Sequence, residues 1–420
     1  MSVGPPAPDV IGVGVVALGR DAVGELVSDF GRRRLGIGCS LPRVAPSLST
    51  PAVASKNKLA SFGTHRVAVM STSSTTPIEL RSDNAAGIAP EILAAIARAN
   101  EGSALAYGAD AMTAQLRELV RDVFAQPTAD VFPVVSGTAA NSLALSALCP
   151  PWGSVLCHET AHIFVNEAGA TSLFSGGAVM RGLPGADYKL QPSSVQHAFD
   201  TTLWRDTHCS QPSVLSITCP TDFGTVYTPV EVTALAALAH DRGLRMHLDG
   251  ARLANAIVAT GATPAGLTTS AGVDAFSLGA IKNGALSTDA IVCVDPSVAE
   301  QLAYRLKRSG HVASKMRFQS TQLVAYLVDG LWLRLAAQAN EAMGALSAGM
   351  AELSVELLSP PAANMLFARV GEPTAAALTD AGLLFYGMGN GVIRFVTSFE
   401  TTEDDVVEVL RRVEQVLSQR

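Results

Sequence analysis

The chain has 420 residues, of which 48% are hydrophobic and 16% charged, and its formal net charge is −7. This composition excludes a chain that is disordered throughout, and the acidic balance argues against a protein that binds the phosphate backbone of nucleic acids. No apolar run approaches the roughly 18–20 residues that span a bilayer, so we expect no membrane association. The six cysteines contain no Cys-x-x-Cys pair, which indicates free thiols in a reducing, cytoplasmic compartment.

The first 78 residues differ in composition from the rest. From Gly31 to Ile78 the chain has no acidic residue but seven basic ones. This bias is typical of a transit peptide, and equally of a disordered leader or of upstream sequence with Met70 as the true initiator; we expect one of the latter two. The segment Gly12–Ala17 imitates a dinucleotide-binding fingerprint but lacks the third glycine at the expected spacing, so we do not interpret it as a site.

From Glu79 onward, stretches with helical periodicity alternate with short apolar stretches typical of buried strands. Strand, helix, strand at this spacing predicts an α/β domain with a mostly parallel sheet wrapped by helices. Helices are predicted at Pro90–Asn100, Thr113–Phe124, Asn141–Leu148 and Val230–Arg242, and strands at Val131–Val135, Ser154–Cys157, Val214–Thr218, Arg245–Leu248 and Ala290–Val294.

The last hundred residues have a different pattern. Arg317–Ala348 is predicted to be long, helical and free of strands, which suits a connector. We therefore divide the chain into a large domain at 79–316, and a connector helix with a small C-terminal α+β domain at 317–420. In the small domain, strands are predicted at Asn364–Val370, Leu383–Tyr386 and Val392–Thr397, and helices at Pro373–Ala381 and Glu403–Leu417.

The segment Ser136–Asn141 follows an apolar strand and opens a helix. Gly137 lets the backbone approach a ligand closely, and Thr138 adds a hydroxyl donor. Backbone N–H groups at a helix N-terminus, with the helix dipole behind them, can bind a phosphate. The alternative is a Ser/Thr helix cap with nothing bound.

A second segment, His247–Arg252, places Asp249 at the end of a buried strand, where open α/β sheets bind ligands. A carboxylate there needs a cation, and a protonated pyridine nitrogen is one candidate. Arg252 can pair with a substrate carboxylate. The alternative is that Asp249 and Arg252 form a structural ion pair.

The third segment is the turn Phe276–Gly284, which carries Lys282 in a small, apolar, glycine-flanked setting. Loss of solvent lowers the pKa of a lysine and makes its amine nucleophilic, although a lone turn lysine is more commonly a surface residue. The three segments in this order resemble the layout of a pyridoxal-phosphate (PLP) enzyme of the aspartate aminotransferase fold type.

The stretch His158–His162 matches the His-Glu-x-x-His pattern of zinc proteases. That site needs both histidines on one helix face and a third ligand downstream. His158 directly follows a predicted strand, and Glu167 is too close in sequence to be the usual third ligand. We therefore expect no metal, and favour His162 as a residue that stacks on a flat cofactor ring.

Taken together, the motifs from about Leu80 to the C-terminus resemble those of the low-specificity L-threonine aldolases, in the threonine aldolase and β-eliminating lyase group of PLP enzymes. The resemblance is specific for the group and less specific for the substrate. Its motifs are Ser82–Asn84, Gly87, Pro90-Glu91, Ala99-Asn100, Tyr107-Gly108, Asp110, Thr113, Ser136–Asn141, Ala161–Ile163, Glu167–Ala170, Ser175–Gly177, Asp249–Arg252, Gly279–Gly284 and Lys315–Arg317.

The resemblance implies the PLP-dependent transferase fold type I and a role for each matched residue. Lys282 is expected to hold PLP covalently, Asp249 to pair with its pyridine nitrogen, and His162 to stack on the ring and act in catalysis. Gly137 and Thr138 are expected to bind the cofactor phosphate. Ser82, Arg252 and Arg394 are expected to bind the substrate carboxylate, with Arg252 also among the cofactor-binding residues. Tyr107 and Arg317 are expected to reach a phosphate in the neighbouring subunit of a homo-oligomer, a homotetramer built as a dimer of dimers.

Many relatives have a second histidine near the site, whereas here Thr221–Val226 offers Asp222. The group that handles the substrate β-hydroxyl is therefore His162 or a water it orders, with Asp222 as a further candidate.

The expected reaction is cleavage of L-threonine, L-allo-threonine and related small-molecule L-β-hydroxy-α-amino acids to glycine and an aldehyde. Four alternatives stay open: a β-eliminating lyase acting on an aromatic amino acid, a phenylserine-preferring aldolase, a transaminase, and a catalytically silent PLP-binding protein.

Overall fold

The structure, a computed structural model, describes residues 76–359 and 361–419. The predictions for the N-terminal extension up to residue 75, including the Gly12–Ala17 segment, lie outside these residues.

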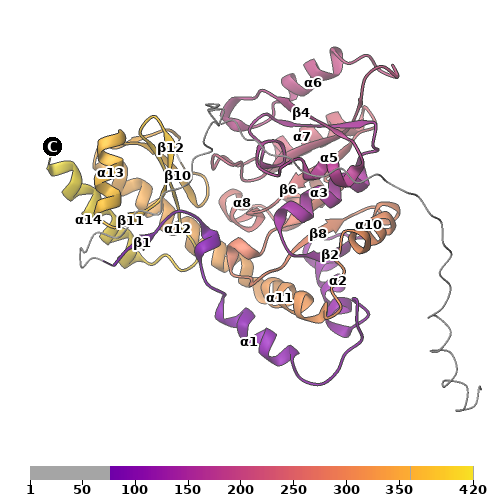
Figure 1. The fold of residues 1–420 in the computed structure, drawn as a ribbon, viewed down its shortest axis with the longest axis horizontal. Coiled ribbons are helices and arrows are strands. Elements are labelled where there is room, and N and C mark those ends of the chain that lie inside the picture. The colour runs from indigo at the N-terminus through magenta and orange to yellow at the C-terminus, as the bar shows by residue number, and fades with distance from the viewer. Residues whose placement is uncertain (1–75, 360, 420) are drawn as a thin grey trace, which may run out of the picture. The chain divides into compact units, whose positions relative to one another are not determined.

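A seven-stranded sheet forms the centre of the large domain (Figure 1), with strand order β2-β8-β7-β6-β5-β3-β4. All five strands predicted in this region are present, and each observed strand overlaps its predicted range. Sequence reasoning gave no bounds for β4 and β7. The bounds are Asp130–Val134 for β2, Gly153–His158 for β3, Val179–Leu183 for β4, Gln211–Thr218 for β5, Arg245–Asp249 for β6, Ala275–Leu278 for β7 and Asp289–Cys293 for β8.

The sheet is mostly parallel, as predicted. Strands β4, β3, β5, β6 and β7 pair in parallel, whereas β8 pairs antiparallel with both β7 and β2. The carboxyl ends of the parallel strands therefore meet at one edge of the sheet, and the first residue of β8, Asp289, lies at that same edge.

Both faces of the sheet are buried under helices. Successive strand residues point to opposite faces, so Phe276 packs in one core cluster with α2, α7, α8, α11 and α12, and Ala275 packs in a second with α3 and α10. These helices are α2 at Ala111–Val123, α3 at Gly137–Leu148, α7 at Pro229–His240, α8 at Leu253–Thr260, α10 at Pro296–Arg308, α11 at Arg317–Leu327 and α12 at Leu331–Glu352.

The large domain also contains shorter elements that sequence periodicity did not identify. They are too short or too irregular for a periodic apolar pattern to stand out. They are η1 at Asp83–Ala85, α4 at His162–Val165, α5 at Ala170–Ser175, η2 at Ala186–Tyr188, α6 at Pro192–Asp200, α9 at Pro264–Leu267, η3 at Thr269–Ala271 and η4 at Ile281–Asn283, beside the predicted helix α1 at Pro90–Ala99.

The predicted connector, 317–348, is helical and strand-free, but it consists of two helices. Between α11 and α12 the 3-10 turn η5 (Val328–Gly330) includes Asp329 with a φ of 53°, a conformation that cannot continue an α-helix. Trp332 at the start of α12 is buried in the same core as α2 and α11.

The small domain has a four-stranded sheet of order β12-β13-β10-β9. The single strand predicted at Leu383–Tyr386 is in fact two strands that belong to different sheets: β11 (Leu383–Leu384) pairs with β1 (Ile78–Glu79), and β12 (Tyr386–Gly389) pairs with β13 (Val392–Val396). The other elements are β9 at Glu356–Leu357, β10 at Met365–Arg369, α13 at Glu372–Asp380 and α14 at Glu403–Ser418.

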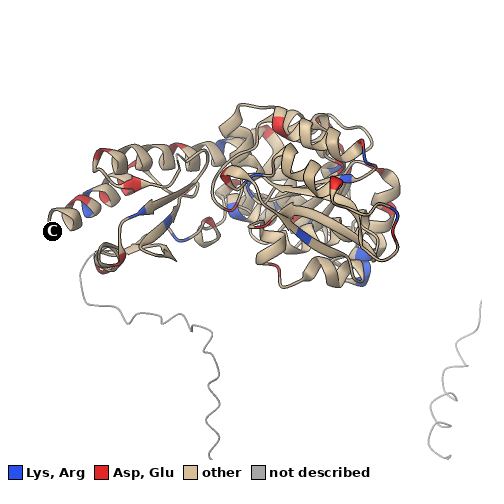
Figure 2. Cartoon of the chain, turned by 90° about the horizontal axis from the view of Figure 1, so that it is seen from above, with Lys and Arg blue, Asp and Glu red and all other residues tan. Residues whose placement is uncertain are grey.

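Acidic and basic residues are interspersed along both domains (Figure 2), for example on α14. Among the described residues, no helix combines the length and apolarity that a membrane crossing requires.

Candidate active site

A cavity of about 470 Å³ lies at the carboxyl edge of the central sheet and reaches the small domain. This volume is within the range of about 300–1,000 Å³ that small-molecule sites occupy. Six residues predicted from the sequence line it, namely Ser82, His162, Asp222, Arg252, Lys282 and Arg394, together with Asn84, Glu159, Thr160, Val165, Asn166, Phe223, Tyr386 and Met388.

Lys282 is in the 3-10 turn η4, directly after β7, and its partly exposed side chain lines the cavity. In the described part of the chain its amine has no hydrogen bond or ion pair. Burial lowers the pKa of Lys282 from its ordinary value, and the nearby Arg252 guanidinium lowers it further. The surface-lysine alternative is therefore wrong: the amine faces the cavity, and a lowered pKa increases the fraction of neutral, nucleophilic amine.

The loops after β6 and β7 interlock through their glycines. A methyl group on Gly250 would overlap the Ser277 carbonyl oxygen, and one on Gly279 would overlap that of Ala251. The Gly279 amide donates to the Gly250 carbonyl at 3.1 Å. This close approach of two backbones brings Asp249, the last residue of β6, near the turn that carries Lys282.

Asp249 is buried, with 1% of its surface exposed. Its Oδ1 accepts hydrogen bonds from the Ala251 amide at 3.1 Å and from the Ser277 hydroxyl at 3.3 Å. Within the described residues it forms no ion pair. The alternative of a structural Asp249–Arg252 pair is therefore wrong.

His162 is held by a buried carboxylate. Its Nδ1 hydrogen-bonds to Glu167 Oε1 at 2.9 Å, and the same oxygen accepts from Asn141 Nδ2 at 3.0 Å. The hydrogen bond to Glu167 raises the pKa of His162, while burial raises the pKa of Glu167. Because Nδ1 is engaged, Nε2 is the ring nitrogen left for a ligand in the cavity.

Asp222 lies beside His162. Its Oδ2 accepts a hydrogen bond from the His162 backbone amide at 2.9 Å. Burial raises the pKa of Asp222, and the Asp249 carboxylate raises it further. The two groups predicted to handle a hydroxyl are thus adjacent on one wall of the cavity.

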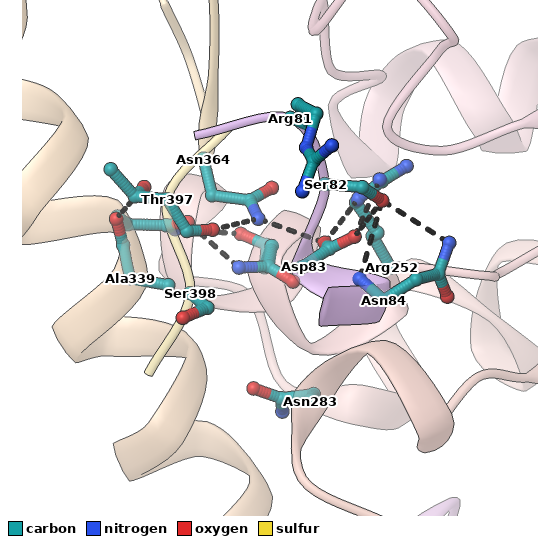
Figure 3. A network of polar contacts seen from close by, with 12 residues as sticks. Arg81, Ser82, Asp83, Asn84, Arg252, Asn283, Ala339, Asn364, Thr397 and Ser398 are labelled. Atoms are coloured by element: carbon teal, nitrogen blue, oxygen red, sulfur yellow. Dashed lines mark hydrogen bonds and ion pairs between the residues drawn. The ribbon is translucent and has the colours of Figure 1, made fainter. Parts of the chain in front are cut away.

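Arg252 is paired with Asp83, which comes from the short turn η1. Arg252 Nε and Nη2 contact the two Asp83 oxygens at 2.6 and 2.8 Å, and Asn364 Nδ2 donates to Asp83 Oδ2 at 3.0 Å (Figure 3). Although burial opposes it, the charge of Arg252 lowers the pKa of Asp83. The pair fixes the guanidinium and leaves its Nη1 edge for a ligand.

Arg394, on β13 of the small domain, reaches the cavity from the other side. Its Nη2 donates to the Arg81 carbonyl at 3.1 Å, whereas its buried Nε has no hydrogen-bond partner within residues 76–359 and 361–419. Burial lowers the pKa of Arg394, and the charge of Arg252 lowers it further. Two guanidinium groups with unused donors therefore face one cavity that also contains Ser82.

Gly137 and Thr138 form the first turn of α3, which begins four residues earlier than predicted. Ser136 caps the helix by accepting from the Ala139 amide at 3.2 Å. The helix-cap alternative is thus present, and it is compatible with anion binding because the amides of Gly137 and Thr138 precede the first intrahelical bond. These two residues do not line the cavity.

Tyr107 and Arg317 also lie away from the cavity in the single chain. Tyr107 is 58% exposed and has Lys307 Nζ 4.6 Å from its ring centre. Arg317 Nη1 donates to the Gly102 carbonyl at 3.1 Å. The structure therefore does not bring these two predicted residues to the site within one subunit.

The zinc-protease pattern does not have the geometry of a zinc site. His158 ends strand β3 and hydrogen-bonds to Thr160 at 2.8 Å and to the Gly185 carbonyl at 3.2 Å, whereas His162 opens helix α4. The two histidines are on different elements, so they do not share a helix face.

Four polar residues of the site had no role assigned from the sequence: Asp83, Asn141, Glu167 and Asp289. All four are buried. Asp83, Asn141 and Glu167 belong to motifs shared with the family, so a polar residue at a motif position was the available signal. Asp289 had only its acidic character at the start of an apolar strand to distinguish it.

Comparison with known proteins agrees with this geometry. The sequence profile of the family described as "Beta-eliminating lyase" matches residues 79–373. A protein named low specificity L-threonine aldolase, from a Pseudomonas species, is 42% identical over 343 residues, covering 81% of this chain and 98% of its own.

Solved structures share the fold. A threonine aldolase from Leishmania major superposes with a TM-score of 0.75 and 28% identity, covering 82% of this chain and 99% of its own. An aspartate aminotransferase from Thermus thermophilus has a TM-score of 0.60 and 17% identity, over 81% of this chain and 92% of its own. The predicted fold type I is thereby confirmed.

Proposed function

Since this chain belongs to the β-eliminating lyase family, we propose that it is a PLP-dependent carbon–carbon lyase that cleaves L-threonine and related L-β-hydroxy-α-amino acids to glycine and an aldehyde. One observation supports this best: a single cavity is lined by Lys282, Arg252 and Arg394, and the buried carboxylate of Asp249 lies close by. Within the described part of the chain, Lys282 and Asp249 form no ion pair, and both arginines have unused donors.

The residues present fit PLP. The buried carboxylate of Asp249, which has no ion pair among the described residues, suits a protonated pyridine nitrogen. The amine of Lys282, which has no hydrogen bond among the same residues, suits a carbonyl group. The N-terminus of α3 at Gly137 and Thr138 suits a phosphate. Each chemical part of the cofactor therefore has a matching group at this edge of the sheet.

PLP, when bound, supplies an electron sink for the electron pair left on Cα when the Cα–Cβ bond breaks. In our proposal Lys282 holds it covalently, Asp249 keeps its ring nitrogen protonated, and His162 packs on the ring.

Arg394, Arg252 and Ser82 bind the substrate carboxylate in this proposal. The Asp83 pair leaves Arg252 a single free edge, and the Arg81 carbonyl holds Arg394 Nη2. Because both side chains are already held, binding requires little further ordering. Such positioning can lower the activation free energy by several kcal/mol, because it aligns the Cα–Cβ bond for cleavage.

His162 or Asp222 then accepts the proton of the β-hydroxyl. Both have pKa values raised from their ordinary ranges, which makes each a stronger proton acceptor. Both side chains lie on one wall of the cavity, where the His162 backbone amide donates a hydrogen bond to Asp222.

Discrimination between the two configurations at the substrate Cβ should be weak. The arginines hold the carboxylate and Lys282 the amine end, and neither contact senses the configuration at Cβ. Apolar Val165, Phe223 and Met388 on the cavity wall leave room for a larger β-substituent. We therefore propose that L-threonine, L-allo-threonine and phenylserine-type substrates are all cleaved, with epimers separated by about 1–3 kcal/mol.

We also propose a cytoplasmic homotetramer, a dimer of dimers. Two residues that match motifs of the family support an oligomer. Tyr107 has 58% of its surface exposed, and Arg317 lies outside the cavity of its own subunit. In this proposal each reaches a phosphate in a neighbouring subunit.

The test incubates the PLP-loaded, full-length protein with all four threonine stereoisomers and quantifies glycine, acetaldehyde, ammonia and keto acid. We expect equal amounts of glycine and acetaldehyde from both L-isomers and none from the D-isomers. Ammonia with a keto acid in place of glycine would show elimination instead, and a preference of more than roughly a thousandfold for one L-epimer would refute the low specificity.

A further inference from the structure

Asp289 is a buried carboxylate that the proposed reaction does not use. It is the first residue of β8, the antiparallel strand of the sheet, and 6% of its surface is exposed. Because β8 runs opposite to its neighbours, its first residue reaches the edge where the parallel strands end. Asp289 therefore lies behind the turn that carries Lys282.

Its Oδ1 atom holds that turn. The backbone amides of Ala280 and Ile281, the two residues before Lys282, donate to Asp289 Oδ1 at 2.7 and 3.0 Å. Two amide donors on one oxygen favour the ionised carboxylate. Its other oxygen faces Gly137, since a methyl group added to Gly137 would lie 3.8 Å from Asp289 Oδ2.

Other contacts to the same turn are neutral. Tyr326 donates its hydroxyl to the Gly279 carbonyl at 3.0 Å, and Asn283 Nδ2 donates to Tyr326 Oη and to the Trp332 carbonyl at 2.9 and 2.8 Å. These bonds anchor the ends of the turn. Asp289 is the charged group among its anchors, and it binds the two peptide groups that immediately precede the lysine.

We propose that Asp289 is a positioning residue for Lys282: it fixes the backbone of the lysine turn through Oδ1, and its carboxylate places a negative charge at that turn. This rests on the proposed role of Lys282 in holding PLP.

The charge balance around Lys282 is compatible with this role. Arg252 lowers the pKa of Lys282, whereas Asp83, Asp249 and Asp289 raise it against the dominant effect of burial. Asp222, on the loop after β5, also interacts with the lysine charge. Burial raises the pKa of Asp289, which its two amide donors and Lys282 oppose. Of these acids, Asp289 is the one that also holds the lysine turn by direct hydrogen bonds.

The test separates the two parts of the role. Asp289→Asn keeps an oxygen that can accept both amides but removes the charge, and Asp289→Ala removes both. Asp295→Asn is the matched control, because Asp295 follows the other end of β8, where it binds Arg245 and the Ser297 amide. Tyr326→Phe removes a neutral anchor of the turn without a change of charge.

The first measurement is the pH titration of the visible absorption band of the PLP-loaded, full-length protein. Loss of a nearby negative charge favours the deprotonated nitrogen, so Asp289→Asn should move the midpoint down by roughly one pH unit. Asp295→Asn and Tyr326→Phe should leave it in place. An unchanged or raised midpoint in Asp289→Asn would overturn the proposed charge role.

The second measurement is retention of PLP during dialysis. Asp289→Ala leaves the buried Ala280 amide and the partly buried Ile281 amide without this acceptor, so its affinity for PLP should fall at least about tenfold. Asp289→Asn should stay within about threefold of the unaltered protein. The positioning of the turn would be refuted if the unaltered protein, Asp289→Asn and Asp289→Ala retained PLP equally. It would also be refuted if the two variants lost PLP to the same extent. If Asp289→Ala does not fold, the Asp289→Asn and Asp295→Asn titrations still decide the proposal.

Failure of the proposed function is distinguishable. If the unaltered protein shows no visible band, the PLP assignment is wrong, and the inference is then decided by chemical labelling of Lys282 in the full-length chain. Labelling near neutral pH should be roughly threefold to tenfold faster in Asp289→Asn, because each unit of pKa changes the neutral amine fraction tenfold. Equal labelling rates would contradict the inference.

Discussion

The two ends of strand β6 carry charged residues in opposite situations. At its start, Arg245 contacts Asp274 at 3.3 Å and Asp295 at 2.8 Å, and Asp274 also accepts from His240 at 2.9 Å. At its end, Asp249 is buried with no ion pair among the described residues. The charged residues at the first edge are therefore paired within the fold. At the second edge Arg252 is paired with Asp83 and His162 with Glu167, whereas Asp249 and Lys282 have no ion pair among the described residues.

This difference shows how one sheet supports both stability and function. An ion pair at a partly exposed edge contributes little, but it leaves nothing unsatisfied. A buried charge without a partner disfavours the empty fold, and a ligand of opposite charge removes that penalty. The perturbed pKa values of Lys282, His162 and Asp222 are gathered at the second edge, as expected of a reactive site.

The largest expected effect is that of Lys282→Ala. We expect the rate of glycine release to fall at least about a thousandfold and the visible PLP band to disappear, because Lys282 is the one lysine among the described residues that line the cavity. Lys189→Ala is the control, since Lys189 is a partly buried lysine whose amine is paired with Glu231 at 2.6 Å. That variant should keep its visible band; a band and full activity in Lys282→Ala would remove the lysine from its role.

Neutralising one acid at each edge of the sheet should have opposite effects on activity and stability. Asp249→Asn should lower kcat at least about a hundredfold while leaving the free energy of unfolding of the PLP-free protein unchanged or higher. Asp274→Asn should do the reverse: about 1–3 kcal/mol less stability, because its ion pairs and its bond to the Met246 amide weaken, with kcat retained.

Urea unfolding and steady-state kinetics on the two variants provide the measurement. If both acids affected stability alike and activity alike, the distinction between the two edges of the sheet would be wrong.

A smaller effect is expected for Glu167→Gln. Glu167 raises the pKa of His162, so its neutralisation should let the imidazole stay deprotonated at lower pH. The acidic limb of the pH profile of kcat/KM should therefore move to lower pH, with about a tenfold loss at the optimum from weaker proton acceptance. A profile that keeps its shape and position would show that Glu167 does not act through His162.

The smallest effect should come from Arg245→Met at the paired edge. Arg245 is 41% exposed, so its ion pairs should contribute no more than about 1 kcal/mol to the free energy of unfolding. The loss of unfolding free energy caused by Arg245→Met should be smaller still in 1 M salt, where charges are screened. Thermal unfolding at low and high salt measures this; a large, salt-independent loss would contradict the account of this edge.

The fold and the centre of the site were predictable from local sequence. In the sequence, an apolar run stops at Asp249, and another ends shortly before Lys282. Gly250 and Gly279 mark the place where the two backbones approach closely. The helical and strand periods gave the mostly parallel sheet, although not the reversal of β8, because direction is a property of the connection and not of the strand.

The sequence did not reveal which polar residues, far apart along the chain, pair with one another in the fold. Arg252 was expected to be paired with Asp249 or free for substrate, yet it binds Asp83, 169 residues away. The roles of Glu167 and Asp289 similarly depend on which segments the fold brings together. For Tyr107 and Arg317 the contacts predicted from the family motifs are not formed within one subunit, so their roles stay a prediction about the oligomer.

The most direct test of the account compares products from L-threonine for the PLP-loaded protein and its Asp249→Asn and Asp274→Asn variants. We expect the unaltered protein and Asp274→Asn to release glycine and acetaldehyde in equal amounts, and Asp249→Asn to release at least about a hundredfold less per unit time. Glycine release by Asp249→Asn at the unaltered rate, or ammonia and keto acid from the unaltered protein, would contradict the assignment of an aldolase site to the carboxyl edge of the sheet.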